Sequence, residues 1–373
     1  MAGKIWDGFA AAAFGLEGLV AAELRKLKIS DVRAENGGVR FRATLEEVFR
    51  ANLSLRTCDR VFLLLAEEEA LTWEDLYQAV LKLPWEHWMR GDEAINLSAR
   101  CVKSRLMSPR DCQAIGKKAI IDRLKSHTSR RVFPESGASF PVQLSLRSDR
   151  LRILLNTSGD ALNRRGYRTW NGEAPLRETL AAALVMLSPW KPGQPLYDPC
   201  CGTGTILIEG ALMAAGQAPG LNRPFAMESF AFWDAAMGRR LREEARNETD
   251  VSRVREIAGS DLDPKALDLA KRHVRQAGFE GQITLSPVPL QEVRLDARDG
   301  VFICNPPYGE RLSDQKTCRR LYQDLHELLR RHPTWRLCAI SSDPAFERSF
   351  GRRATRKRRF YNGRLECVYY IYE

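Results

Sequence analysis

The sequence has no long hydrophobic run, since none of the apolar stretches in its 373 residues is long enough to span a bilayer. Its first residues also lack the basic region, apolar core and cleavage site that together form a secretory signal. These absences argue against a membrane-spanning or secreted protein. We therefore expect a cytoplasmic protein with no membrane partner.

Cysteine and histidine patterns typical of metal sites are missing too. The nine cysteines are isolated apart from Cys200-Cys201, no Cys-x-x-Cys pair occurs, and the chain has only five histidines. A zinc cluster would need closely spaced ligands, and a disulfide framework would need paired cysteines in an oxidising compartment. The sequence therefore predicts reduced, mostly buried cysteines and no metal.

Acidic residues are outnumbered by basic ones. The chain has 58 Lys and Arg against 47 Asp and Glu, a net charge of +11. Ten Lys or Arg and only two Asp lie between Arg100 and Arg131, so most of the excess is concentrated there. Basic residues neutralise phosphates and release counterions, so this charge favours a nucleic-acid partner. A basic surface that serves solubility alone is the other interpretation.

Hydrophobic periodicity predicts two small α+β units before residue 164. Helices are expected near residues 16–27, 45–54, 73–81 and 109–125, and strands near residues 9–13, 94–99, 142–146 and 151–155. In the helix at 109–125, four basic residues lie away from the apolar stripe: Lys117, Lys118, Arg123 and Lys125. They are suited to contact phosphates, or they form an ordinary solvated helix face.

The most informative stretch begins with a short apolar strand that ends at Asp198. It is followed by a glycine loop, Cys200-Cys201-Gly202-Thr203-Gly204, and an apolar run from Ile206 that predicts a helix. This is the strand, loop and helix unit of a nucleotide-type site. The three-glycine dinucleotide pattern and the Gly-Lys-Ser/Thr of a P-loop are both absent, so an adenosine ligand without phosphates is favoured.

A second strand end supplies an acid. The segment 258–263 ends in Asp261-Leu262-Asp263, and a carboxylate there can accept hydrogen bonds from the two hydroxyls of a ribose. We choose Asp261 for that contact, with Asp263 behind it.

A third strand, expected at 300–304, leads into Asn305-Pro306-Pro307-Tyr308. Two prolines fix φ and remove two N–H donors, which leaves carbonyl acceptors beside an amide oxygen and a phenol ring. Such a turn can accept hydrogen bonds from a planar amine while the ring stacks on the attached base.

These motifs, from Asp198 to Thr205 and from Asn305 to Leu312, resemble those of class I S-adenosylmethionine-dependent methyltransferases that act on exocyclic amines. They look most like the bacterial RNA methyltransferases that carry a THUMP domain, including the N2-guanine methylating half of a bifunctional 23S rRNA enzyme. The resemblance implies S-adenosylmethionine as cofactor. It implies catalytic roles for Asn305, Pro306, Pro307 and Tyr308, and cofactor binding by Asp198, Cys200, Cys201, Gly202, Thr203, Gly204, Asp261, Leu262 and Pro289.

One segment departs from the family pattern. Where members often place an acid for the adenine amine, this chain has Ser286-Pro287-Val288-Pro289. We expect a backbone group near Pro289 to replace the acid.

The resemblance implies an α/β fold with three domains. A ferredoxin-like subdomain is expected over residues 1–65, a THUMP RNA-binding domain over 66–163 and a Rossmann-like methyltransferase domain over 164–373. Three further segments carry expectations, and the last two of them have two interpretations each. Arg164, Arg165 and Arg168 are expected to continue the RNA contact from a linker. The aromatic residues at 225–233 form a core or stack on a base, and the six basic residues at 352–359 contact phosphates or form a solvated edge strand.

The function expected is methylation of a flipped purine, with guanine N2 in 23S rRNA preferred. A tRNA guanine-N2 methyltransferase, a non-catalytic RNA-binding assembly factor and a DNA amine methyltransferase are the alternatives. The motifs leave open guanine N2 against adenine N6, the RNA concerned and the oligomeric state.

Overall fold

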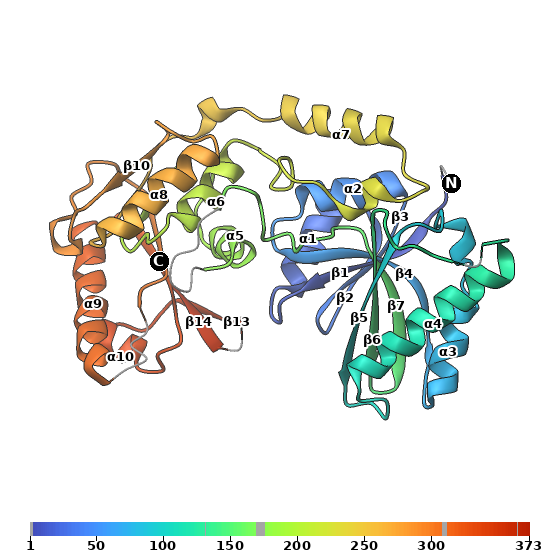
Figure 1. Ribbon diagram of the computed structural model, residues 1–373. Helices are drawn as coiled ribbons and strands as arrows, with labels where there is room; N and C mark the ends of the chain where they lie inside the picture. Colours follow the sequence, from blue (N-terminus) through green and yellow to red (C-terminus); the bar gives the residue numbers. More distant parts are fainter. Residues whose placement is uncertain (1–2, 131, 169–175, 308–311, 364) are drawn as a thin grey trace. The chain divides into compact units, whose positions relative to one another are not determined.

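The computed structural model describes residues 3–130, 132–168, 176–307, 312–363 and 365–373. The chain forms two compact units, each built from separate segments (Figure 1). Unit 1 comprises residues 1–12, 20–162 and 223–242, and unit 2 comprises residues 13–19, 163–222 and 243–373. Among the described residues, no helix is both long enough and apolar enough to cross a membrane.

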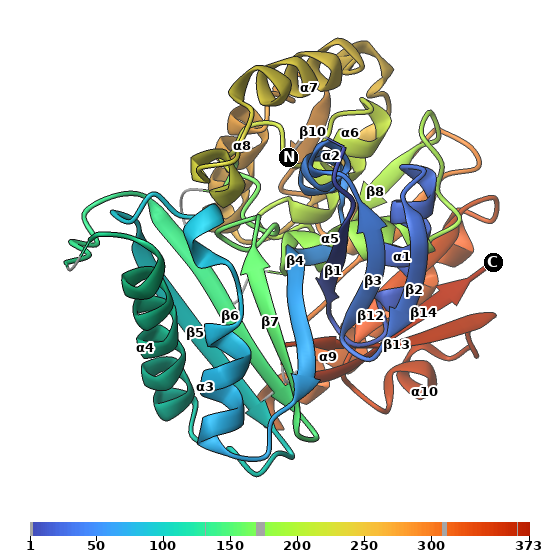
Figure 2. The ribbon, with the colours of Figure 1, turned by 90° about the vertical axis from the view of Figure 1, so that its right-hand side faces the viewer.

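Unit 1 is built on a seven-stranded sheet with the order β2-β3-β1-β4-β7-β6-β5. Its strands are β1 (Trp6–Ala12), β2 (Ser30–Glu35), β3 (Gly38–Ala43), β4 (Cys58–Glu69), β5 (Ala94–Val102), β6 (Ser139–Arg147) and β7 (Arg150–Asn156). Its main helices are α1 (Glu17–Lys26), whose first turn belongs to unit 2, α2 (Leu45–Ser54), α3 (Trp73–Leu81) and α4 (Pro109–His127). Helices α3 and α4 lie side by side against this sheet (Figure 2).

One strand, β4, joins the two halves of this sheet. Its first part pairs with β1, from Leu63 opposite Gly8 to Cys58 opposite Ala12. Its pairing with β7 continues to Glu69 opposite Arg150. The strands β1 to β3 and the strands β5 to β7 therefore form one continuous sheet, joined through β4.

The insertion at 223–242 belongs to the core of unit 1. Phe225 and Phe230 are buried. The Trp233 ring centroid lies 4.8 Å from that of Phe49, and Phe232 stacks on Trp6 at 6.1 Å. The core interpretation of this aromatic group is confirmed, because its rings are packed against rings of the N-terminal half.

Unit 2 contains a second seven-stranded sheet with the order β10-β9-β8-β11-β12-β14-β13. Its strands are β8 (Leu196–Asp198), β9 (Ile257–Ser260), β10 (Ile283–Ser286), β11 (Val301–Cys304), β12 (Arg336–Ser341), β13 (Arg356–Asn362) and β14 (Leu365–Tyr372). The first five are parallel, and β14 pairs antiparallel with both β12 and β13. This order confirms the Rossmann-like fold with a terminal antiparallel hairpin.

Two helical layers cover this sheet. Helices α5 (Glu178–Leu187), α6 (Thr205–Ala214) and α8 (Pro264–Gln276) pack in one core with Val301 and Ile303 of β11. Helices α9 (Leu312–Arg331) and α10 (Phe346–Phe350) share the other core with Phe302 and Cys304. Alternate residues of β11 thus enter opposite layers, as expected for a strand buried on both faces.

Candidate functional site

The candidate site lies at the carboxyl edge of the unit 2 sheet. Strand β8 is hydrogen-bonded in parallel to β9 on one side and to β11 on the other. The chain therefore proceeds outward from β8 in one direction through β9 and β10, and in the other through β11 and β12. Ligands of open α/β sheets bind at such a reversal of strand order. Asp198 is the last residue of β8, and Asp261 and Asn305 directly follow β9 and β11, so the structure brings the three predicted motifs to one edge.

The glycine loop turns tightly between β8 and α6. Gly202 and Gly204 both have positive φ, 51° and 79°, a conformation that favours glycine. The Cys201 N–H donates to the Ser260 carbonyl at 3.0 Å, which ties the loop to the end of β9. The N-terminus of α6, with its unpaired N–H groups and positive dipole end, follows directly after Gly204.

Asp198 is a buried acid at the start of this loop. Its Oδ1 accepts a hydrogen bond from the Cys200 N–H at 3.0 Å, and its relative exposure is 1%. Burial raises the pKa of the Asp198 carboxyl well above its usual range. The negative charge of Asp261 raises this pKa further, whereas the hydrogen bond from the Cys200 N–H lowers it. A positively charged group beside it would stabilise the ionised form of this carboxyl.

Asp261 connects the glycine loop to the next strand end. Its Oδ2 accepts from the Gly202 N–H at 2.8 Å and its Oδ1 accepts from the Asp263 N–H at 3.0 Å. A carboxylate has about four lone-pair sites, so acceptors remain for a ribose diol. Asp263 caps α8 by accepting from the Lys265 N–H at 2.9 Å. Leu262, between the two acids, is an exposed apolar side chain, with 67% of its surface accessible.

The segment expected to contact adenine follows β10. The Pro289 carbonyl accepts from the Glu292 N–H at 2.8 Å, and proline has no N–H of its own. Leu290 begins the short helix η4 (Leu290–Glu292), so its N–H has no acceptor within that helix. The backbone contact expected near Pro289 stays a prediction.

The turn after β11 is partly described. Asn305 is half-buried, Pro306 is buried and Pro307 is exposed, whereas Tyr308 lies outside the described residues. The Tyr322 hydroxyl of α9 donates to the Pro307 carbonyl at 3.2 Å. Burial raises the pKa of Tyr322 to about 12, so the hydroxyl keeps the proton that it donates.

Three family models match successive parts of the chain. The RlmL ferredoxin-like domain matches residues 7–62, the THUMP domain residues 70–156, and the RMKL-like methyltransferase domain residues 165–371. The putative RNA methyltransferase YpsC of Bacillus subtilis is 36% identical over 99% of this chain and 96% of its own length. The chain belongs to the THUMP-domain-containing class I S-adenosylmethionine-dependent RNA methyltransferases.

Two further similarities extend this result. The ribosomal RNA large subunit methyltransferase K/L of Methylococcus capsulatus is 36% identical over 98% of this chain, which spans 51% of that longer protein. The crystal structure of SMU.472, a putative methyltransferase complexed with SAH, superposes with a TM-score of 0.94 at 38% identity, over 99% of this chain and 98% of that one.

Two residues that position the site of this methyltransferase gave no sequence signal. Tyr322 contacts the Pro307 carbonyl from a helix 15 residues away. The His273 Nδ1 lies 3.2 Å from the Thr203 carbonyl of the glycine loop, 70 residues away. Neither residue belongs to a motif, so only the folded structure shows that they hold the two turns.

The expectation that Arg165 and Arg168 continue the RNA contact is wrong. Arg165 is buried and its Nε lies 3.4 Å from a Glu209 oxygen. Arg168 donates to the Thr205 hydroxyl at 2.5 Å and pairs with Glu178 at 3.3 Å. Both guanidinium groups are used inside unit 2, because buried carboxylates need a paired charge.

The basic helix α4 is only partly free to contact phosphates. Arg123 donates to both oxygens of Glu86, at 3.0 and 2.7 Å, and Lys117 pairs with Glu135 at 2.6 Å. Lys118 and Lys125 are exposed. The RNA contact of this helix stays a prediction, and these two lysines are the exposed ones among the four basic residues named for it.

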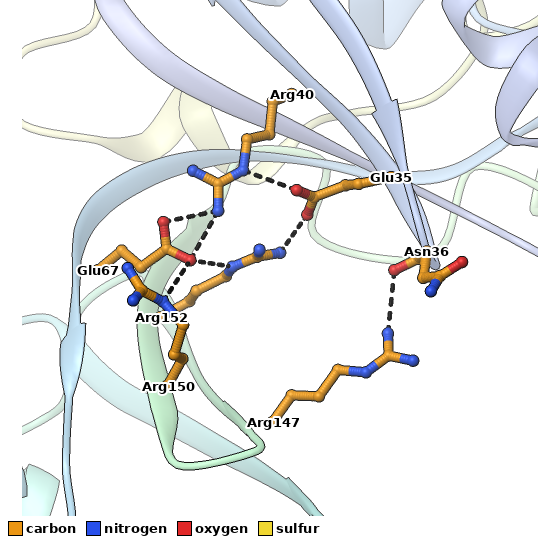
Figure 3. A network of polar contacts seen from close by, with 7 residues as sticks. All are labelled: Glu35, Asn36, Arg40, Glu67, Arg147, Arg150 and Arg152. Atoms are coloured by element: carbon orange, nitrogen blue, oxygen red, sulfur yellow. Dashed lines mark hydrogen bonds and ion pairs between the residues drawn. The ribbon is translucent and has the colours of Figure 1, made fainter.

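A second group of arginines in unit 1 is also neutralised. Arg40, Arg150 and Arg152 surround Glu35 and Glu67 (Figure 3). Burial opposes ionisation, yet the hydrogen bonds from Arg40 and Arg152 hold the pKa of Glu67 below its usual value. These side chains come from β2, β3, β4 and β7, so the network ties together the strands of both halves of the sheet.

Proposed function

We propose that this chain transfers a methyl group from S-adenosylmethionine to an exocyclic amine of a flipped purine, guanine N2 in 23S rRNA. The observation that supports this most directly is the common edge of β8 and β11. There the glycine loop with Asp198 and the turn Asn305-Pro306-Pro307 leave neighbouring parallel strands. A cofactor bound by the glycine loop and an amine bound by the turn after β11 therefore meet at one edge of the sheet.

The residues after β11 orient the amine. The Asn305 side-chain oxygen and the Pro306 carbonyl accept the two amine hydrogens, which directs the nitrogen lone pair toward the cofactor. The same acceptors stabilise the positive charge that develops on the nitrogen during transfer. Bound S-adenosylmethionine supplies a methyl group activated by a positively charged sulfur. The methylated amine afterwards loses a proton to water, so the chain needs no general base.

The cysteines at this edge do not supply a nucleophile. Burial raises the pKa of the thiols of Cys200, Cys201 and Cys304 above that of an ordinary cysteine. The thiolate is the reactive form, so these thiols are inert near neutral pH. Covalent attack on a base by cysteine is therefore disfavoured against direct transfer to an amine.

The choice of RNA rests on similarity. The Methylococcus capsulatus relative is named for large-subunit ribosomal RNA, and this chain corresponds to about half of it. The THUMP domain at residues 70–156 adds a domain of RNA methyltransferases rather than a sequence-reading DNA module. We therefore place ribosomal RNA before tRNA or DNA as the substrate.

Methyl labelling of separated RNA pools tests this function. Purified chain is incubated with methyl-labelled S-adenosylmethionine and with either large-subunit rRNA or tRNA from a strain that lacks the gene. We expect label in 23S rRNA, recovered as N2-methylguanosine by mass spectrometry of nucleosides. Asn305→Ala should lower the rate by ~100-fold or more through loss of one acceptor, while calorimetry shows unchanged cofactor binding.

Each contrary result rejects a separate part of the proposal. Label confined to tRNA would reject ribosomal RNA, and N6-methyladenosine would reject guanine. A chain that binds RNA but not S-adenosylmethionine would support a non-catalytic assembly factor instead.

A further inference from the structure

Two aromatic side chains of unit 2 are exposed and touch each other. The ring centroids of Phe14 and Tyr361 lie 5.7 Å apart with an interplanar angle of 79°. Phe14 is 60% exposed and Tyr361 is 38% exposed. Phe14 belongs to the segment 13–19, which is early in the sequence but part of unit 2, and Tyr361 lies near the end of β13. Neither residue belongs to the cofactor loop or to the turn after β11.

The fold holds Phe14 in this exposed position. Leu16, two residues later, is 1% exposed and shares a core with Phe360 of β13. Gly15 has a φ of +91°, and a Cβ added there would lie 2.8 Å from the Arg359 backbone oxygen. The segment therefore runs directly against the free edge of β13. Phe14 is therefore held in solvent by an anchored loop, next to a second exposed ring.

The basic residues of β13 differ in how closely they are paired with acids. This edge strand carries four consecutive basic residues at 356–359. The first two are paired, Arg356 with Glu373 and Lys357 with Glu347. Arg359 approaches Glu366 only at 3.9 Å with 81% of its side chain exposed, and Arg358 makes no ion pair within the described part of the chain. The two arginines of β13 without a close ion pair are thus the two nearest to Tyr361 in the sequence.

We propose that Phe14, Tyr361, Arg358 and Arg359 form a binding platform for an unpaired stretch of RNA. A base stacks on the Phe14 ring while the arginines hold the adjoining phosphates. Exposed aromatic rings beside exposed arginines are the combination by which proteins bind single strands, since every base has a stacking face. An acidic protein partner would use the charges but not the ring face. The inference rests on the proposed function in one respect only, that the substrate is RNA.

Substitutions at Phe14 test the stacking. Binding of a fluorescent 12-nucleotide oligouridine to the full chain is followed by anisotropy, with a blunt RNA duplex as a second probe. Phe14→Leu keeps an apolar side chain but removes the ring, and is expected to weaken oligouridine binding at least ~5-fold, with little change for the duplex. Phe14→Tyr should bind like the wild type. Leu365→Ala, which removes a 41% exposed apolar residue of the same hairpin, is the matched control and should have no effect.

Salt dependence tests the charges. Each phosphate contact to a single strand adds about 0.7 to the slope of log K against log salt. The double variant Arg358→Ala with Arg359→Ala should therefore lower that slope by about 1.4. The double variant Arg356→Ala with Lys357→Ala is the control, because it removes the same number of charges from the same strand. It should change the slope much less, since those two side chains are already paired with acids.

The outcomes separate this platform from the methylation proposal. If the Phe14→Leu variant binds oligouridine as tightly as the wild type, the platform is overturned, even if the chain methylates 23S rRNA. Oligouridine binding that depends on Phe14, in a chain that methylates no RNA, would uphold the platform and reject the methylation. Sedimentation could also show a dimer. If Phe14→Leu dissociates that dimer without loss of RNA affinity, a second copy of the chain covers the rings and the platform is overturned.

Discussion

Removal of one buried hydroxyl, in Tyr322→Phe, is expected to impair catalysis from outside the motif. The hydroxyl donates to the Pro307 carbonyl at 3.2 Å from a side chain that is 0% exposed. A hydrogen bond of this kind contributes about 0.5–1.5 kcal/mol to folding, so Tm should fall by about 2–4 °C. The larger effect is on geometry, because a displacement of ~1 Å at the reacting groups can cost ~100-fold in rate. We expect kcat to fall ~10-fold, with the KM for S-adenosylmethionine unchanged.

A second tyrosine of the same core provides the control. The Tyr372 hydroxyl also donates to a backbone carbonyl, that of Arg352, at 3.3 Å, and the residue is 1% exposed. Tyr372→Phe should therefore cost a similar free energy of unfolding without a loss of kcat. Single-turnover methylation of RNA and thermal unfolding are measured for both variants. Equal kcat values for the two would refute the idea that Tyr322 positions the turn.

Three further changes follow from the structure. Asp261→Ala removes the acceptor of the Gly202 N–H and the acceptor proposed for the ribose, so calorimetry should show S-adenosylmethionine binding ~10-fold weaker. Unchanged affinity would contradict the ribose contact. Gly259→Ala places a methyl group 2.8 Å from the Asp198 backbone oxygen, so urea denaturation should show a loss of about 1–3 kcal/mol, and full stability would show that the sheet adapts. Hydrogen bonds from Arg123 lower the pKa of Glu86 from 4.5 to about 2, so this pair stabilises the fold above pH 4.5 and is lost as the pH falls toward 2. Glu86→Gln should therefore lose less stability over that range in thermal unfolding, and an identical pH profile would argue against the pair.

The sequence predicted helix ends best where the cap is local. Helices α2 and α3 begin and end where the periodicity predicts. Each starts with a capping box, Thr44 with Glu47 and Thr72 with Asp75, whose partners lie three residues apart. Strand β4 was not predicted, because its second half carries glutamates where a buried strand should be apolar. One of them, Glu67, is matched by Arg40 and Arg152, 27 and 85 residues away, and no local pattern shows that match.

The same limit applies to the site. The motifs at Asp198, Asp261 and Asn305 could be placed at strand ends because each follows its own strand in the sequence. The burial of Arg165 and Arg168 could not be predicted, since it depends on ion pairs with Glu209 of α6 and Glu178 of α5. A basic residue in a polar segment looks exposed until the fold brings a buried carboxylate to it.

The two units are folded from interleaved segments, and this limits how the enzyme can be divided. A cut at the predicted boundary between residues 163 and 164 would separate the insertion 223–242 from the rest of unit 1. Phe225, whose ring centroid lies 5.4 Å from that of Phe49, would lose the aromatic side chain against which it packs. Arg223 would likewise lose the Asp160 and Ala161 carbonyls to which it donates at 2.8 and 2.5 Å. The isolated catalytic segment would therefore expose aromatic surface and an unpaired guanidinium, so its loss of activity would report misfolding rather than a need for RNA-binding domains.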